Sequence, residues 1–229
     1  MAPSTKADQA YLSLRRAIVV GQIPGDEALD EVALVQQLGT GRTPIREALK
    51  RLALEQFIVW PPRRTPYVRD LSVKDLHRLY ESRMQLELPA ARLAATRATD
   101  QQLREVQRLG DEVRRTARAG DVYANIEADH ALHIAITRGA DNRFLTEAVD
   151  RLNCGSLRLW YVAHQRVGLR DVADTHQQII DALLTRDPQV AEQAVRDHIL
   201  LSLRRQLSLN ADGFATVDDY AIEARDSVG

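Results

Sequence analysis

The stretch GTGRTPIREALKRLALEQFIV, residues 39–59, decides the fold of the N-terminal part of the chain. After Arg42, apolar side chains return at the spacing of one helix face, and these are Ile45, Leu49, Leu52 and Ala53. Pro44 is compatible with a helix that begins here, because the first helical turn has unpaired N–H groups. The opposite face carries Arg42, Arg46 and Lys50. The stretch therefore predicts a short helix with one buried face and one basic face.

Two further helices and a hairpin are predicted around this one. YLSLRRAIVVG predicts a helix with Leu12 and Ile18 on its apolar face, and LDEVALVQQLG predicts a second, capped by Asp30 and stopped by Gly39. FIVWPPRRTPYVRDL predicts two short strands joined by a proline-rich turn. Three helices followed by such a hairpin form a winged helix-turn-helix, which we expect over residues 1–70.

The remainder of the chain has a different pattern, with helical periodicity almost without a break from Leu71. It predicts helices near 72–97, 100–119, 122–138, 142–167, 169–185 and 188–209. Residues 71–210 are therefore expected to form an all-α bundle of six helices, and residues 211–229 a loose tail. The expected fold class is mainly α, a winged helix-turn-helix followed by this bundle.

The composition is that of a soluble globular protein, with 45% hydrophobic and 28% charged residues among 229. No apolar run approaches the roughly 20 residues that cross a bilayer, so we expect no membrane partner. The single cysteine, Cys154, cannot form an internal disulfide, which favours a reducing cytoplasm. Its neutral surroundings predict an ordinary buried or half-buried thiol, not a reactive one.

Basic residues gather in one region of a nearly neutral chain, whose net charge is -1. Between Gly41 and Arg69 seven Lys or Arg residues face only Glu47 and Glu55, a pattern typical of a surface that meets a polyanion. A recognition helix entering the major groove by its N-terminus would present Arg42, Thr43 and Arg46 to DNA. The other basic residues assigned to DNA are Lys50 on the same helix and, at the wing tip, Arg63 and Arg64. The alternative is an ordinary domain with solvated arginines.

The segment EADHALHIA, residues 127–135, places Asp129 and His133 four residues apart and so on one helix face. His176 and His198 fall on the apolar faces of the last two expected helices. Each histidine alone is better explained as a hydrogen-bonded core residue. Burying all four polar groups together is costly unless a cation neutralises them, so the set predicts a divalent metal site. Zinc is the first candidate, with nickel or manganese as alternatives.

The stretch RTPIREAL resembles the recognition region of the GntR family of bacterial transcription regulators. The helical part resembles the FadR-type C-terminal (FCD) domain of that family, in the VanR-like branch, at LYESRMQLELPAARLAA, at DHALH and at the late histidines. The resemblance covers about residues 11–209. It implies DNA contacts by Arg42, Thr43 and Arg46 and a wing at 63–66. Gly41 replaces the family's usual serine, and Gln56 and Thr65 stand where the family usually has glycines.

The same resemblance implies what the helical part does. The pattern D-x-x-x-H followed by two later histidines is the metal-binding pattern of that domain, and such domains commonly bind small organic acids in the same cavity. Arg83 would receive the carboxylate, or else be a surface arginine paired with Glu87. Asn142 and Tyr161 are further candidates for the cavity lining. The expected protein is a homodimeric repressor that reads a palindromic operator and responds to a small acid.

Two other functions stay open on sequence alone. The first is a metal-responsive regulator in which the ion itself is the signal. The second is a helical metallohydrolase, which has the required His and Asp ligands. Against the hydrolase, the chain has no H-E-x-x-H, no G-x-S-x-G and no evident spare carboxylate to act as general base. We therefore expect no enzymatic activity.

Overall fold

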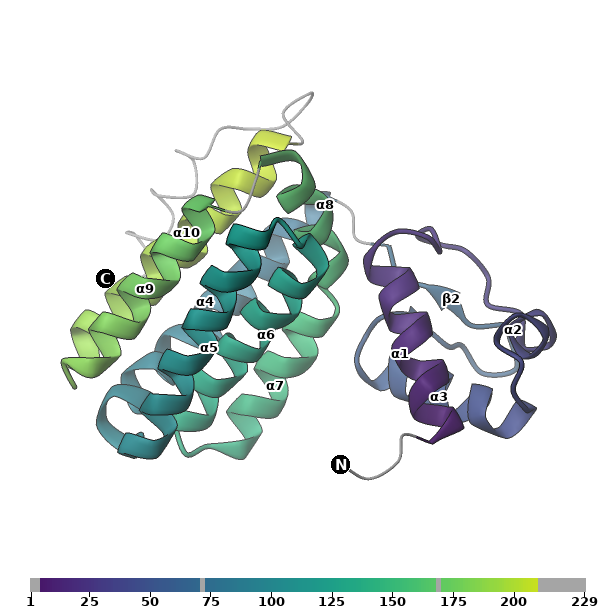
Figure 1. Ribbon diagram of the computed structural model, residues 1–229, viewed down its shortest axis with the longest axis horizontal. Helices are drawn as coiled ribbons and strands as arrows, with labels where there is room; N and C mark the ends of the chain where they lie inside the picture. Colours follow the sequence, from purple (N-terminus) through teal and green to yellow (C-terminus); the bar gives the residue numbers. More distant parts are fainter. Residues whose placement is uncertain (1–4, 71–72, 168–169, 210–229) are drawn as a thin grey trace.

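The computed structural model describes residues 5–70, 73–167 and 170–209. Figure 1 shows an N-terminal part of three helices and a small hairpin, beside a set of longer helices that lie side by side. The predicted tail, residues 211–229, lies outside the described residues. The architecture confirms the expected class, a winged helix-turn-helix followed by an all-helical domain.

The N-terminal part contains α1 (Lys6–Val19), α2 (Glu31–Leu38), α3 (Arg42–Leu54), β1 (Ile58–Val59) and β2 (Tyr67–Val68). The two strands pair antiparallel, with Ile58 opposite Val68. Asp30 caps α2 by accepting hydrogen bonds from two backbone N–H groups of the first turn, as its sequence position predicts. Gly39 ends α2 in the left-handed region, with φ +60°.

The faces of α1 and α3 follow the sequence pattern with two differences. On α3 the fully buried residues are Ile45, Ala48, Leu49 and Leu52, while Ala53 is half-buried. On α1, Leu12 was expected on the apolar face but is 55% exposed. The buried face of α1 is rotated toward Leu14 and Ile18 and includes the charged residue Arg15. The pattern of apolar residues could not assign Arg15 to the interior.

Two residues around the wing adopt positive φ angles. Gln56 adopts φ +67°, which is unfavourable for a side chain with a Cβ by roughly 1–2 kcal/mol. In the turn, the residue with positive φ is Arg63, at +60°, and not Thr65. The tip of the wing is therefore shaped by the arginine that was assigned to DNA.

The described part of the C-terminal domain contains seven helices, one more than expected. They are α4 (Val73–Arg97), α5 (Asp100–Ala119), α6 (Val122–Gly139), α7 (Arg143–Cys154), α8 (Leu157–Val167), α9 (Arg170–Leu184) and α10 (Pro188–Leu209). The difference arises because the predicted helix 142–167 is divided into α7 and α8.

The division lies where the bundle meets the segment that leads into the wing. A Cβ on Gly155 would lie 3.2 Å from Cβ of Gln56, so a larger residue here would require Gln56 to shift by a few tenths of an ångström. The N–H of Ser156 donates to the carbonyl of Asn153 at 3.0 Å, a tight turn that ends α7. The helix break thus coincides with a close contact between the two domains.

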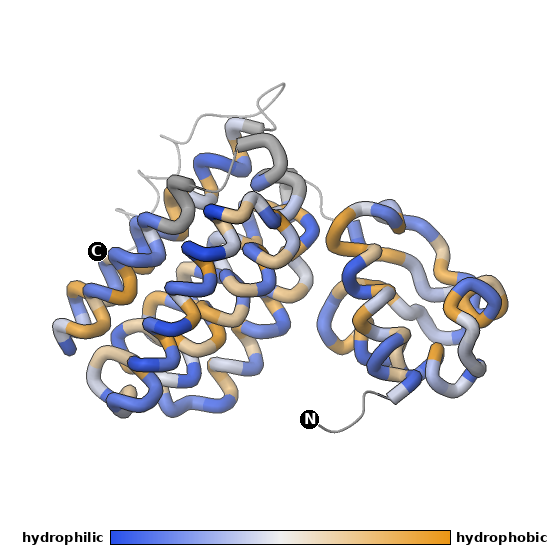
Figure 2. The backbone as a smooth tube through the Cα atoms, viewed as in Figure 1, coloured by the Kyte–Doolittle hydropathy of each residue, from blue (hydrophilic) through white to orange (hydrophobic). Residues whose placement is uncertain are grey.

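Helix α6 is the central element of the bundle and packs against α4, α5, α7 and α8. Every residue from Leu132 to Thr137 is buried, as expected for a helix covered on all sides. Figure 2 shows hydrophobic and hydrophilic residues alternating along the bundle helices, which is typical of helices with one buried side. Neither α6 nor any other helix in the described ranges is long and apolar enough to cross a bilayer.

The two domains share one apolar cluster. The core of the N-terminal part continues into the bundle through Ile126, Cys154, Leu157 and Trp160. Beside this cluster, the buried guanidinium of Arg15 on α1 forms an ion pair with Glu127 on α6. We call this region the joint, and it links α1 directly to the start of α6.

Substitution of Gly39 by Ala should lower the free energy of unfolding by about 1 kcal/mol, because only glycine adopts φ +60° there without strain. Chemical denaturation followed by circular dichroism measures the change. Gly41→Ala is the matched control, since Gly41 has φ -82° and its nearest neighbour to a new Cβ is 3.7 Å away. Equal losses for the two variants would contradict the explanation.

Candidate metal and DNA-binding sites

Three helices bring together the four side chains that the sequence singled out. Asp129 and His133 come from α6, His176 from α9 and His198 from α10, and all four are buried. The centroids of the imidazole rings lie 5.5 Å apart for His133 and His176, 5.0 Å for His133 and His198, and 4.4 Å for His176 and His198. We call these four residues the histidine cluster.

Each histidine of the cluster has one ring nitrogen held by a neighbour. Nδ1 of His133 lies 2.8 Å from Oε2 of Glu87, and Nδ1 of His198 lies 3.1 Å from Oγ1 of Thr175. Nε2 of His176 lies 2.7 Å from Oδ1 of Asp129. The contacts of His133 and His198 fix the orientation of each imidazole, as the outer partners of metal ligands do, whereas the contact of His176 joins it to another candidate ligand.

The donor set fits a divalent cation. One ligand-type atom from each of the three histidines lies within 4.8 Å of the other two. Nε2 of His133 is buried and has no hydrogen-bond partner among the residues that the structure describes. A buried polar atom without a partner is costly, and an ion on this nitrogen would remove the cost.

The charge states of the cluster also suit a cation. Burial alone would raise the pKa of Asp129, but the neighbouring His176 holds it well below its usual range, so the carboxylate is ionised. Burial and the nearby His176, His133 and Arg83 lower the pKa of His198 well below 6.5. His198 is therefore neutral at pH 7, as a ligand must be.

Arg83 on α4 extends the cluster. It is not at the surface, since it is 1% exposed, but it does pair with Glu87, with 2.6 Å from Nε to Oε1. Burial opposes ionisation of Glu87, yet Arg83 and His133 lower its pKa to about 2. Glu87 thus joins the arginine to the metal-ligand candidate His133. The guanidinium also lies 4.8 Å from the ring centroid of Trp160.

Asn142, one of the residues assigned to the effector cavity, lies elsewhere. It is exposed, and its side chain accepts a hydrogen bond from the N–H of Leu145 as the cap of α7. It follows α6, nine positions beyond His133, and the sequence pattern alone did not identify it as the cap that starts α7. Tyr161, the other residue assigned to the cavity, is half-buried on α8 and packs against the core of the N-terminal part.

The residues assigned to DNA form an exposed basic surface. Arg42, Thr43, Arg46 and Lys50 are exposed on α3, and Arg63 and Arg64 are exposed at the wing tip. Nε of Arg46 lies 3.5 Å from Oε1 of Glu31, the first residue of α2. Gly41 occupies the cap position of α3 and makes no side-chain hydrogen bond there. The positive end of α3 is therefore left uncapped by a side chain.

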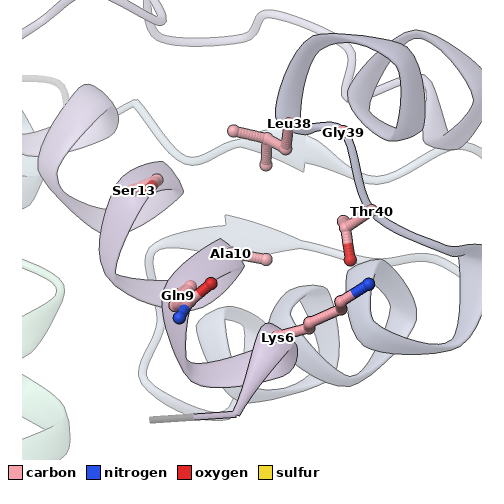
Figure 3. A pocket seen from close by; sticks show the side chains of 7 residues that line it. All are labelled: Lys6, Gln9, Ala10, Ser13, Leu38, Gly39 and Thr40. Atoms are coloured by element: carbon pink, nitrogen blue, oxygen red, sulfur yellow. The ribbon is translucent and has the colours of Figure 1, made fainter.

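A small pocket of about 200 Å³ lies beside the start of α3. Figure 3 shows Lys6 on α1 extending toward Thr40, the second residue after α2. The hydroxyl of Thr40 is buried without a hydrogen-bond partner in the described part of the chain. Sequence reasoning gave no role to either residue.

Sequence reasoning also missed the partners that orient the histidines. Thr175 directly precedes His176 but contacts His198, so no spacing signal pointed to it. Glu87 carried one usable signal, its position four residues after Arg83. That spacing predicted the ion pair, whereas its contact with His133, 46 positions later in the chain, depends on how α4 packs against α6.

Comparison with known proteins gives matches over both domains. Residues 6–68 match the family described as "Bacterial regulatory proteins, gntR family", and residues 78–201 match the "FCD domain". The "Probable D-xylose utilization operon transcriptional repressor" of Paenarthrobacter nicotinovorans is 31% identical over 196 residues, 86% of each chain. The "HTH-type transcriptional repressor RspR" of Escherichia coli (strain K12) is 27% identical over 211 residues, 90% of this chain and 92% of that one.

Among solved structures, "E. coli McbR/YncC" superimposes with a TM-score of 0.76, covering 90% of this chain and 99% of that chain at 22% identity. A putative GntR regulator from Rhodococcus sp. RHA1 gives 0.71, covering 88% and 97% at 20% identity. At these identities the likeness supports the fold alone.

Substitution of Arg83 by Met should lower the free energy of unfolding of the metal-free protein by about 3–5 kcal/mol, because it leaves Glu87 charged and buried without its partner. Adding Glu87→Gln should recover part of the loss. Arg108→Met, which removes an exposed pair with Glu105, is the control and should cost no more than about 1 kcal/mol. Similar losses for both arginines would show that the buried pair is not essential.

Proposed function

The chain belongs to the gntR family of bacterial regulatory proteins, and we propose that this DNA-binding transcription regulator is a repressor that senses a small organic acid together with a divalent cation in its FCD domain. The observation that carries the proposal is the convergence of Asp129 and three histidines from three helices in the bundle interior. Its closely related proteins named as repressors support the direction of control.

The charges of the buried groups favour an acid as effector. When the histidines bind a metal they must be neutral, and the remaining charges are then one positive on Arg83 and one negative each on Glu87 and Asp129. A divalent cation would change this net charge from -1 to +1. A singly charged carboxylate would then make the interior neutral, which is the least costly state for buried charges.

The proposed ligands are His133, His176 and His198, whose ring nitrogens lie close together, and Asp129, which contacts His176. When bound, zinc, nickel or manganese would supply a positive centre that attracts a carboxylate oxygen. Arg83 offers the second contact. Glu87 occupies the edge of the guanidinium formed by Nε and Nη2, and an effector carboxylate would bind to another donor edge of the same group.

The DNA-binding unit is residues 1–70, and the sensing unit, residues 71–210, would also form the homodimer. A dimer would place two α3 helices about one DNA turn apart, which matches a palindromic operator. Arg42, Thr43 and Arg46 would read bases and phosphates, with Lys50, Arg63 and Arg64 at the backbone. Lys6 and Thr40, beside the start of α3, are additional candidates for a phosphate contact. DNA binding and the presence of a single, unpaired cysteine both favour a cytoplasmic location for the protein.

The joint gives a physical route from the effector to DNA. Glu127 pairs with Arg15 of the DNA-binding domain, and Asp129 lies two residues further along α6. A small displacement of α6 on ligand binding would therefore act directly on α1. An effector that binds more tightly when α6 is displaced than when it is not would shift the protein toward the displaced state and so change its operator affinity.

A second function in the same class is a regulator that responds to the ion alone. The unpartnered Nε2 of His133 favours metal binding but does not distinguish a permanent ion from a signalling one. If chelation by itself changes operator affinity, the ion is the signal. If only an added acid changes affinity at fixed metal, the ion is a fixed part of the acid site.

Arg46→Ala should weaken operator binding and reduce the slope of log affinity against log salt by about 1, because one phosphate-contacting cation is lost. Fluorescence anisotropy with a duplex selected by the native protein from random DNA measures both quantities. Arg104→Ala, an exposed arginine on α5, is the control and should change neither. An unaltered salt slope in Arg46→Ala would remove this residue from the DNA surface.

His198→Ala should lower the affinity for zinc by at least about tenfold, and native protein should lose this zinc as the pH falls below about 6. The sign follows because ligand imidazoles must be neutral, and protons compete with the ion as the pH falls. Calorimetric titration of chelator-treated protein checks both. His77→Ala, a histidine outside the cluster, is the control. Equal zinc affinity in His198→Ala and native protein would contradict the assignment.

A further inference from the structure

A second group of ligand-type side chains lies on another face of α6. His130 comes from α6, and Asp150 and Cys154 come from α7, four residues apart and so on one helix face. Nε2 of His130 lies 3.0 Å from Oδ1 of Asp150. Sγ of Cys154 lies 3.7 Å from each of these two atoms. Because consecutive helical residues point about 100° apart, His130 faces away from its neighbour Asp129 and the histidine cluster.

The three distances match those between ligands of a tetrahedral zinc ion. Zinc lies about 2.0–2.1 Å from nitrogen and oxygen ligands and about 2.3 Å from sulfur, so the nitrogen and oxygen lie about 3.3 Å apart and sulfur about 3.6 Å from each. The observed 3.0, 3.7 and 3.7 Å reproduce this triangle. One face of the tetrahedron is therefore formed without moving the backbone.

The surroundings allow an ion to enter and complete its coordination. The side chain of Asp150 is 47% exposed and that of His130 is 13% exposed, while Cys154 is buried at 4%. Solvent can therefore reach the oxygen side of the group, and a water molecule can take the fourth position. Such a path is a requirement for any metal site.

We propose that His130, Asp150 and Cys154 bind a thiophilic divalent cation such as zinc at the joint between the DNA-binding domain and the bundle. This site is separate from the histidine cluster and does not depend on the function proposed for that cluster. Its ligands are one imidazole, one carboxylate and one thiolate. This ligand set selects zinc-like ions over magnesium or calcium, which prefer oxygen ligands.

Binding exchanges a proton for the ion. Burial and the neighbouring Asp150 raise the pKa of the Cys154 thiol, so in the metal-free protein the thiol donates a weak hydrogen bond to Oδ1 of Asp150. The cation displaces this proton to solvent and forms the sulfur–metal bond. The two negative charges of Asp150 and the thiolate then balance the cation in a partly buried place.

The location gives the ion a structural consequence. Cys154 is the last residue of α7 and belongs to the apolar cluster shared with the DNA-binding domain. Gly155, the next residue, lies against Gln56 at the start of the wing. An ion here would tie the last turn of α7 to α6 at the point where the DNA-binding domain rests on both.

Cobalt(II) is the probe, because a cobalt–thiolate bond gives a charge-transfer absorption and the chain has only one cysteine. Chelator-treated full-length protein titrated with cobalt should show this absorption, and zinc in excess of both proposed sites should abolish it. Cys154→Ser should remove it. Asp150→Asn, a change at a largely exposed side chain that leaves the thiol in place, should weaken the thiolate-detected cobalt affinity by about tenfold or more.

His198→Ala is the control that separates the two sites, because it removes a ligand of the histidine cluster only. It should keep the cobalt–thiolate absorption and lose the other bound ion. A native protein that takes up cobalt without this absorption would overturn the proposal and leave the three residues as a hydrogen-bonded group. Equal thiolate-detected affinity in native protein and Asp150→Asn would overturn it too, because the cysteine alone would then be binding cobalt.

Discussion

Two carboxylates, Glu87 and Asp129, are buried in the middle of the helical domain, and the structure around them depends on neutralising their charge. A carboxylate in an apolar interior is strongly unfavourable without a partner. Arg83 and His133 meet Glu87, and His176 meets Asp129, so each charge has a named neighbour. These contacts join α4, α6 and α9 through polar groups where a bundle would otherwise use only apolar packing.

The same helix that carries this cluster also supports the DNA-binding domain. Helix α6 contributes Glu127 and Ile126 to the joint and Asp129 and His133 to the cluster, all within two turns. A protein interior is close-packed and transmits small displacements instead of absorbing them. The histidine cluster and the contact with the DNA-binding domain thus lie on one helix, with only a few residues between them.

Much of the fold could be read from the sequence because its signals are local. The faces of α3, the caps at Asp30 and Gly39 and the strand pair follow from neighbours in the chain. The departures occur where distant segments touch. Leu12 is exposed while Arg15 is buried against Glu127, and one expected helix is divided into α7 and α8 beside the close approach of Gly155 to Gln56. The start of α7 makes Asn142 a helix cap, which the sequence pattern did not predict.

The stretch RTPIREAL by itself indicated the family of the protein. The sequence also determined that the protein is mainly helical and that Asp129 and His133 share a helix face, because helical periodicity puts residues four apart on one face whatever surrounds them. Tertiary structure alone decided which residues those faces meet. Glu87 and His133 are separated by 46 positions, and His130 and Cys154 by 24. No local rule relates residues so far apart; only the packing of α6 against α4 and α7 sets their distance.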